Sequence, residues 1–114
     1  MDAKLKRKWL KALRSGEYRQ GRGKLVSERG TNFCCLGVLA DVMGCEWQPD
    51  ANEFSSMLVP ILPGARKPLA SDGDEMLDEK RIGLSSAKQN KLAELNDGGA
   101  PFAVIADYIE KFVG

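Results

Sequence analysis

The residue types that most often carry out chemistry are sparse in this chain. It has no histidine and three cysteines, two of them adjacent at Cys34 and Cys35 and the third at Cys45. Without imidazole, Ser-His and Cys-His nucleophilic catalysis and His-containing zinc sites are excluded. Adjacent cysteines on a helix diverge by about 100 degrees, so they do not form half of a metal site. We expect buried, reduced thiols, with no metal and no cofactor.

Two other patterns resemble catalytic or metal-binding motifs. Ser85 and Lys88 have the Ser-x-x-Lys spacing of penicillin-binding enzymes, but Ser86 and Gln89 overlap them with the spacing of a helix capping box. Segment 71–80 has two aspartates, Asp72 and Asp74, at the spacing of a calcium loop, without the later oxygen ligands or the required glycine. Helix capping and an acidic turn explain both patterns better, so we expect that the protein is not an enzyme.

The charge distribution points to binding instead of catalysis. Residues 1–31 contain ten Lys or Arg and three Asp or Glu, whereas the rest of the chain contains seven and thirteen. A basic region of this kind often contacts an acidic partner, although it can equally fold against the acidic part of the same chain. The candidate binding residues are Lys4, Arg7, Lys8, Lys11, Arg14, Tyr18, Arg19, Gln20 and Arg22.

Two predicted helices position these side chains. Residues 2–14 have apolar and basic residues on opposite sides, and Gly16 supplies a left-handed helix end. Residues 33–43 are apolar on nearly all sides, which predicts a buried central helix with Asn32 as its cap. Gly37 and Asp41 share one stripe of that helix with Cys34. The stripe is either a packing seam or one wall of a candidate pocket.

The other elements complete an α+β prediction. Residues 24–27 and a turn at 28–31 suggest a small hairpin, and 57–62 suggests a short edge strand containing Pro60. The C-terminal third predicts a helix from Ser86 and a last helix after Pro101, with Phe102, Ile105, Ala106, Ile109, Phe112 and Val113 on its apolar face. We expect one compact domain over residues 1–114. It would hold about four helices around the central helix, with a small hairpin or short antiparallel sheet; segment 46–82 is the least defined.

The N-terminus has no apolar signal core, and no apolar run approaches the roughly 20 residues that a membrane span requires. We therefore expect a cytoplasmic protein without a membrane partner.

Three stretches together resemble a known group of proteins. They are residues 9–20 (WLKALRSGEYRQ), residues 32–41 (NFCCLGVLAD), and residues 92–98 (LAELNDG) with Phe102 and residues 105–110 (IADYIE). The pattern is similar to short proteins of unassigned function that are encoded by tailed bacteriophages and prophages. The resemblance implies an accessory protein in an infected bacterium, where small phage proteins often bind and disable host or defence components. It implies no catalytic residues.

Three functions are compatible with these observations. The first is a non-enzymatic phage accessory protein that binds and inhibits a bacterial protein with an acidic surface. The second is a nucleic-acid-binding module that uses the basic N-terminal face; a helix-turn-helix over residues 86–113 is disfavoured because Asp107 and Glu110 would repel phosphate. The third is a protein that sequesters a nucleotide signal, with Tyr18, Arg19, Gln20 and Arg22 closing over the anion and Gly37 permitting close approach.

Overall fold

The structure is a computed structural model that describes residues 1–50, 57–71 and 76–114. Its elements, in chain order, are α1 (Ala3–Ser15), β1 (Arg19–Gln20), β2 (Asn32–Phe33), α2 (Cys35–Val42), β3 (Glu46–Pro49), β4 (Leu58–Ile61), β5 (Ala70–Ser71), β6 (Met76–Leu77), α3 (Glu79–Ile82), α4 (Ser86–Asp97) and α5 (Phe102–Phe112). The α+β class is confirmed. The described part has five helices, and α3, a single turn, is the one that the sequence did not predict.

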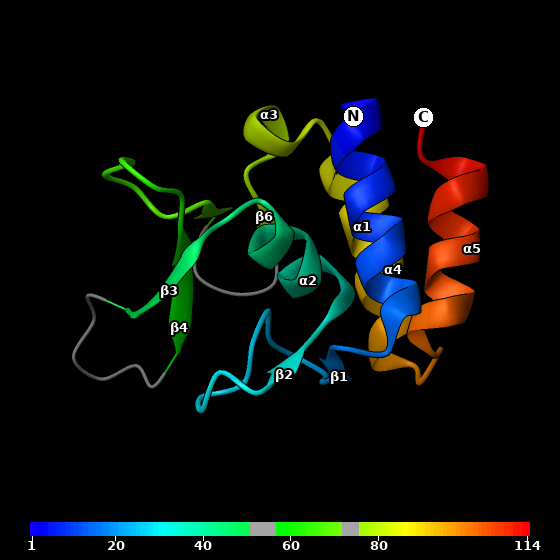
Figure 1. The fold of residues 1–114 in the computed structure, drawn as a ribbon, viewed down its shortest axis with the longest axis horizontal. Helices are drawn as coiled ribbons and strands as arrows, with labels where there is room; N and C mark the ends of the chain where they lie inside the picture. Colours follow the sequence, from blue (N-terminus) through cyan, green and yellow to red (C-terminus); the bar gives the residue numbers. More distant parts are fainter. Residues whose placement is uncertain (51–56, 72–75) are drawn as a thin grey trace.

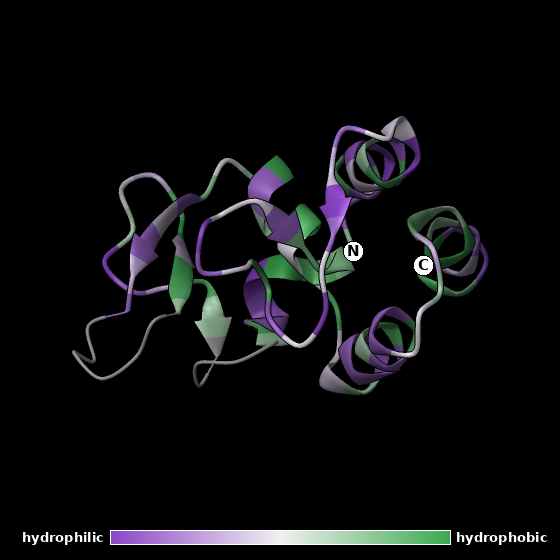
Figure 2. Cartoon of the chain, turned by 90° about the horizontal axis from the view of Figure 1, so that it is seen from below, coloured by the Kyte–Doolittle hydropathy of each residue, from purple (hydrophilic) through white to green (hydrophobic). Residues whose placement is uncertain are grey.

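Three long helices form one side of the molecule, and α2 lies between them and the β3–β4 ribbon (Figure 1). Figure 2 shows α1, α4 and α5 nearly end-on, arranged around a common centre to which each contributes buried apolar side chains. The buried core joins these helices to α2 through Trp9, Leu36, Leu39, Leu92, Ile105 and Ile109, all of which are fully buried. The two chain ends meet, since the Met1 amino group donates to the Gly114 carbonyl over 3.2 Å.

Helix α1 follows the prediction closely. The Asp2 carboxylate accepts a hydrogen bond from the Leu5 amide at 2.9 Å and so caps the first turn. Gly16, with φ of 77°, ends the helix in the left-handed conformation. The indole N–H of Trp9 donates to the Cys35 carbonyl at 2.8 Å, which ties α1 to the start of α2.

Helix α2 is buried as predicted, but its predicted start is wrong by two residues. Asn32 and Phe33 form β2, which pairs in parallel with β1, and Phe33 also bridges Val26 in the antiparallel sense of the predicted hairpin. The Asn32 carbonyl accepts from the Ser27 amide and the Phe33 carbonyl from the Gly21 amide, so these backbones are used in strand pairing. The cap is Cys34 instead of Asn32, and its sulfur accepts from the Gly37 amide at 3.4 Å.

The described part of segment 46–82 contains two short strand pairs. The predicted edge strand is confirmed as β4, which pairs antiparallel with β3 and places Pro60 opposite Trp47. A second antiparallel pair joins β5 to β6. Residues 72–75 of the acidic run predicted as a turn lie outside the described residues, but the end of the run forms β6 and the start of α3.

The capping box predicted at Ser86 and Gln89 is wrong. Ser85 is the cap of α4, since its hydroxyl accepts from the Lys88 amide at 3.3 Å, while Ser86 binds the Glu79 carboxylate. Gln89 is fully buried and uses its amide on β6, accepting from the Leu77 amide and donating to the Leu77 carbonyl. A buried polar anchor therefore occupies the position that the spacing assigned to a cap.

The last helix also departs from the prediction at its end. Pro101 is the cap of α5, and most of the predicted apolar face is buried. Phe112 is an exception, because it is 50% exposed and packs its ring against Tyr108 at 4.8 Å between centroids. In the described part of the chain, no helix is long and apolar enough to span a membrane.

Candidate functional site

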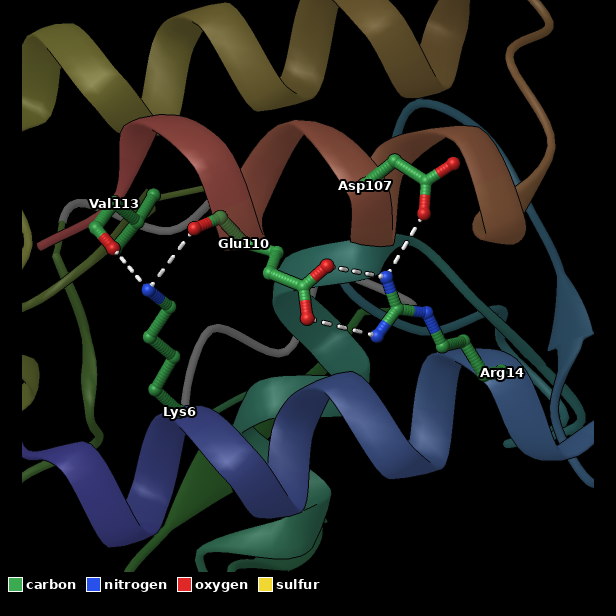
Figure 3. A network of polar contacts seen from close by, with 5 residues as sticks. All are labelled: Lys6, Arg14, Asp107, Glu110 and Val113. Atoms are coloured by element: carbon green, nitrogen blue, oxygen red, sulfur yellow. Dashed lines mark hydrogen bonds and ion pairs between the residues drawn. The ribbon is translucent and has the colours of Figure 1, made fainter.

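The basic residues of α1 separate into two sides, and one side is used inside the fold. Arg14 pairs with Asp107 at 2.8 Å and with Glu110 at 3.2 Å, both on α5 (Figure 3). These hydrogen bonds raise the pKa of the Arg14 guanidinium. The ammonium group of Lys6 donates to the carbonyl oxygens of Glu110 and Val113, near the negative end of the α5 dipole. On this side, the basic half folds against the acidic half, which was one of the two interpretations of the charge asymmetry.

The other side of α1 carries exposed cations beside apolar side chains of α2. We define the α1–α2 surface by seven of the residues that line two adjoining grooves there: Lys4, Leu5, Lys8, Lys11, Ala12, Val42 and Met43. The grooves have volumes of about 310 and 350 Å³ and share Lys8 and Val42. Asp2 and Glu17 stand at opposite ends of the surface. The surface is therefore a lysine-rich strip over an apolar floor, with a carboxylate at each end.

The ammonium groups of the lysines on this surface have no ion pair or hydrogen bond to any other described residue. Lys4, Lys8 and Lys11 are exposed and recur at spacings of four and three, which places them on one face of α1. Arg7 is exposed as well and lies one turn from Lys4 and Lys11. Four predicted binding residues are thus brought together with their charges available, whereas Arg14 is neutralised.

Tyr18 forms the edge of this surface and is tied to α2. Its hydroxyl donates to the Asp41 carboxylate at 2.5 Å, and the other carboxylate oxygen accepts from the Trp47 indole at 3.0 Å. Phe33 lies edge-on between the two rings. Burial, together with the hydrogen bond to Asp41, raises the pKa of Tyr18, so it stays protonated at neutral pH. The Asp41 carboxylate therefore has an internal structural role.

Gly37 lies in a packing seam, which is one of the two interpretations of its stripe. A Cβ at this position would lie 1.8 Å from the Leu25 carbonyl oxygen. The backbone of the 24–27 segment therefore fills the space that a pocket at Gly37 would need. Together with the hydrogen bonds to Asp41, this leaves no space for a ligand between Gly37 and Asp41.

The remaining predicted binding residues do not converge on one anion. Gln20 donates its amide to Asn96 Oδ1 at 3.1 Å and to the Ala100 carbonyl at 2.7 Å. Arg19 is exposed on β1. Arg22 is exposed in the following loop, close to Gly99. Because Tyr18 and Gln20 are committed to internal hydrogen bonds, the anion cage predicted from Tyr18, Arg19, Gln20 and Arg22 is not assembled.

Sequence reasoning missed the buried polar residue that holds these loops. Asn96 is fully buried; its Oδ1 also accepts from the Cys35 amide at 3.3 Å, and its Nδ2 donates to the Gly21 carbonyl at 2.7 Å. It shares the buried face of α4 with Gln89 and Leu92. The spacing of three and four residues between Gln89, Leu92 and Asn96 could have predicted that Asn96 is buried and hydrogen-bonded, since a polar residue on an apolar helix face needs internal partners.

The cysteines are buried free thiols, as predicted. Burial raises the pKa of Cys35 and, with a smaller effect from Asp41, raises that of Cys45 to about 11. Neither thiol is thus activated as a nucleophile at neutral pH. Over residues 1–50, 57–71 and 76–114, no group of three or more Cys, Asp or Glu side chains is arranged to hold a metal ion.

Comparison with known proteins gives a family for the chain. The family model described as Domain of unknown function (DUF8296) matches residues 1–113. No curated protein and no solved structure matches the chain. Since the match covers nearly all of its length, the chain belongs to the DUF8296 family.

Proposed function

We propose that this protein is a non-enzymatic binding protein whose α1–α2 surface docks on an acidic surface of a bacterial protein and inhibits it. The observation that carries the proposal is the strip of exposed lysines, without internal partners among the described residues, beside an apolar floor. The inhibitory role and the setting, the cytoplasm of an infected bacterium, come from the resemblance to phage accessory proteins.

The composition of the α1–α2 surface favours a protein partner. Lysine ammonium groups attract carboxylates and speed the encounter, while Leu5, Ala12, Val42 and Met43 offer apolar area whose burial stabilises a complex. Aspartate or glutamate side chains interspersed with apolar ones would match both features. The carboxylates of Asp2 and Glu17 at the ends would then repel acidic groups of the partner and so restrict where along the surface it can bind.

Nucleic acid is the second candidate, favoured by the alignment of Lys4, Lys8 and Lys11 on one face of α1. Several phosphate contacts along one strand could use such a row. Asp2 and Glu17 flank the row, however, and Arg14 is already paired with α5. A polyanion would meet repulsion at both ends of the row, so the nucleic-acid function is the weaker of the two.

A capture experiment with matched variants tests the proposal. The wild-type chain, Lys8→Glu with Lys11→Glu, and Lys67→Glu with Lys91→Glu are immobilised and exposed to a nuclease-treated bacterial lysate. Both doubles change the net charge from +1 to −3, but the second pair is exposed outside the α1–α2 surface. We expect one protein to be retained by the wild type and the control, to be lost with the first double, and to lose its activity on binding.

Two outcomes would contradict this expectation. If both double variants retain the partner protein as well as the wild type does, the α1–α2 surface is excluded as its binding site. Binding to mixed DNA or RNA that weakens steeply with salt and disappears in Lys8→Glu with Lys11→Glu, without any retained protein, would favour the nucleic-acid function instead.

A further inference from the structure

A second surface feature, away from the α1–α2 surface, has the chemistry of an anion site. A pocket of about 390 Å³ lies between the loop after β1 and the turn before β2. Among the described residues, those that line it are Gly21, Arg22, Lys24, Ser27, Glu28, Arg29, Thr31 and Asn32. Three of these side chains are cationic and one is anionic, so these eight residues carry a net charge of +2. This position differs from the anion cage that the sequence predicted around Tyr18 and Gln20.

The charges of the lining are available to different degrees. Lys24 and Glu28 pair with each other at 3.2 Å. Arg22 and Arg29 are exposed and have no hydrogen bond or ion pair to another described residue. Each guanidinium offers five N–H donors in a planar fork that matches the oxygens of a phosphoryl or carboxylate group. The two arginines are therefore the groups that would bind an anion.

A hydroxyl hydrogen adds a neutral donor to the pocket. Ser27 Oγ accepts from the Thr31 amide at 3.2 Å and from the Asn32 amide at 3.1 Å, which uses both of its lone pairs. The Ser27 and Thr31 hydroxyl oxygens lie 3.3 Å apart, and the assignment consistent with the two bonds that Ser27 already accepts has Ser27 donating and Thr31 accepting. The hydroxyl hydrogen of Thr31 thus remains available for a ligand.

The pocket is held in place by contacts between one wall and α4 and by the contact of its two walls with each other. On one wall, the Gly21 carbonyl accepts from buried Asn96, and the Gly23 amide donates to Asp97 at 3.0 Å. The walls also touch, since a Cβ at Gly21 would lie 3.0 Å from the Asn32 Cβ. A pocket that is already formed requires little ordering when a ligand binds.

We propose that this pocket binds a small phosphomonoester through its phosphoryl group, with Arg22, Arg29 and the Thr31 hydroxyl as donors. A phosphomonoester carries about −1.5 to −2 charges at pH 7, which matches the net +2 of the lining. The volume of about 390 Å³ leaves space for a group beyond the phosphate. No aromatic side chain of the described residues lines the pocket, so the recognition that we propose depends on the phosphoryl group and not on stacking of a base.

NMR titration of the folded chain tests the proposal with defined probes: inorganic phosphate, ribose 5-phosphate, adenosine monophosphate, adenosine, and a short single-stranded RNA. We expect the three phosphate compounds to shift the amide signals of Gly21, Arg22, Thr31 and Asn32, and adenosine to leave them unchanged. Stronger binding of ribose 5-phosphate than of inorganic phosphate would identify the ester as the ligand, and equal binding would identify the free ion with the same phosphoryl chemistry.

Matched variants make the outcome decisive. Arg22→Gln and Arg29→Gln should each weaken phosphate binding about 10-fold, as expected for loss of a charge-assisted hydrogen bond. Arg66→Gln, an exposed arginine outside the pocket, makes the same change in charge and should leave the affinity unchanged. Unchanged binding in the Arg22 and Arg29 variants, equal shifts with adenosine, or binding of RNA without binding of the small phosphates would overturn the proposal. The Lys8 and Lys11 variants should bind phosphate normally, which separates this site from the proposed function.

Discussion

Replacing Asn96 with alanine should destabilise the fold strongly, because one buried side chain satisfies backbone groups from two other segments. Its amide holds the Cys35 N–H at the start of α2 and the Gly21 carbonyl in the loop after β1. Loss of the partner costs about 1–3 kcal/mol for the buried Cys35 N–H, and the lower part of that range for the half-buried Gly21 carbonyl. The gain in helix propensity from Asn to Ala returns about 0.5 kcal/mol. We therefore expect a net loss of about 3 kcal/mol in the free energy of unfolding.

Urea denaturation followed by circular dichroism measures this loss. With a denaturant slope of about 2 kcal/mol/M, the midpoint should fall by about 1.5 M urea. Asn90→Ala is the matched control, since it makes the same change on the same helix at an exposed position. The control should be neutral or slightly stabilising, by at most about 0.5 kcal/mol. A loss below about 1 kcal/mol in Asn96→Ala would refute the view that Asn96 anchors these loops.

Three further predictions concern packing and ionisation. Gly37→Ala should lower the free energy of unfolding by about 3 kcal/mol or more, because the added Cβ would lie 1.8 Å from the Leu25 carbonyl oxygen. A loss below about 1 kcal/mol in thermal or urea unfolding would contradict the close packing of the Leu25 backbone against Gly37. Alkylation of Cys45 in the folded protein should keep accelerating up to pH of about 11, and a plateau near pH 9 would contradict its raised pKa. Hydrogen bonds with Arg81 and Ser86 lower the pKa values of Asp78 and Glu79 in the folded state. The two carboxylates should therefore stabilise the fold fully above their ordinary pKa values of 3.8 and 4.5, and this stabilisation should disappear as the pH falls through their lower folded pKa values. In unfolding measured as a function of pH, the double variant Asp78→Asn with Glu79→Gln should lose less stability in acid than the wild type does.

The sequence predicted the long helices well because their signals are local. The Gly16 end and the apolar spacing of α1 act within one or two turns, and the structure has both features. The start of α2 was placed two residues early because Asn32 is a good cap in isolation. Strand pairing with the Gly21 and Ser27 backbones decides the outcome there, and those partners are distant signals that a local rule does not include.

The candidate site was predictable in its residue types but not in its grouping. The row of Lys4, Lys8 and Lys11 follows from helical spacing alone. Arg14 pairs on α5 with residues more than 90 positions away, which depends on how the two helices pack together and is not determined by sequence spacing. The pocket between Arg22 and Arg29 likewise depends on the turn geometry between two strands.

Photo-crosslinking from the α1–α2 surface tests the central claim most directly. Benzoylphenylalanine replaces Lys8, which lines both grooves, or Lys91, an exposed position on α4 that serves as the control. In a bacterial lysate, we expect position 8 to give one discrete protein adduct that survives nuclease treatment and is competed by the unmodified chain but not by Lys8→Glu with Lys11→Glu. Equal adducts from both positions, or an adduct at position 8 that nuclease removes, would contradict a protein-binding role for this surface.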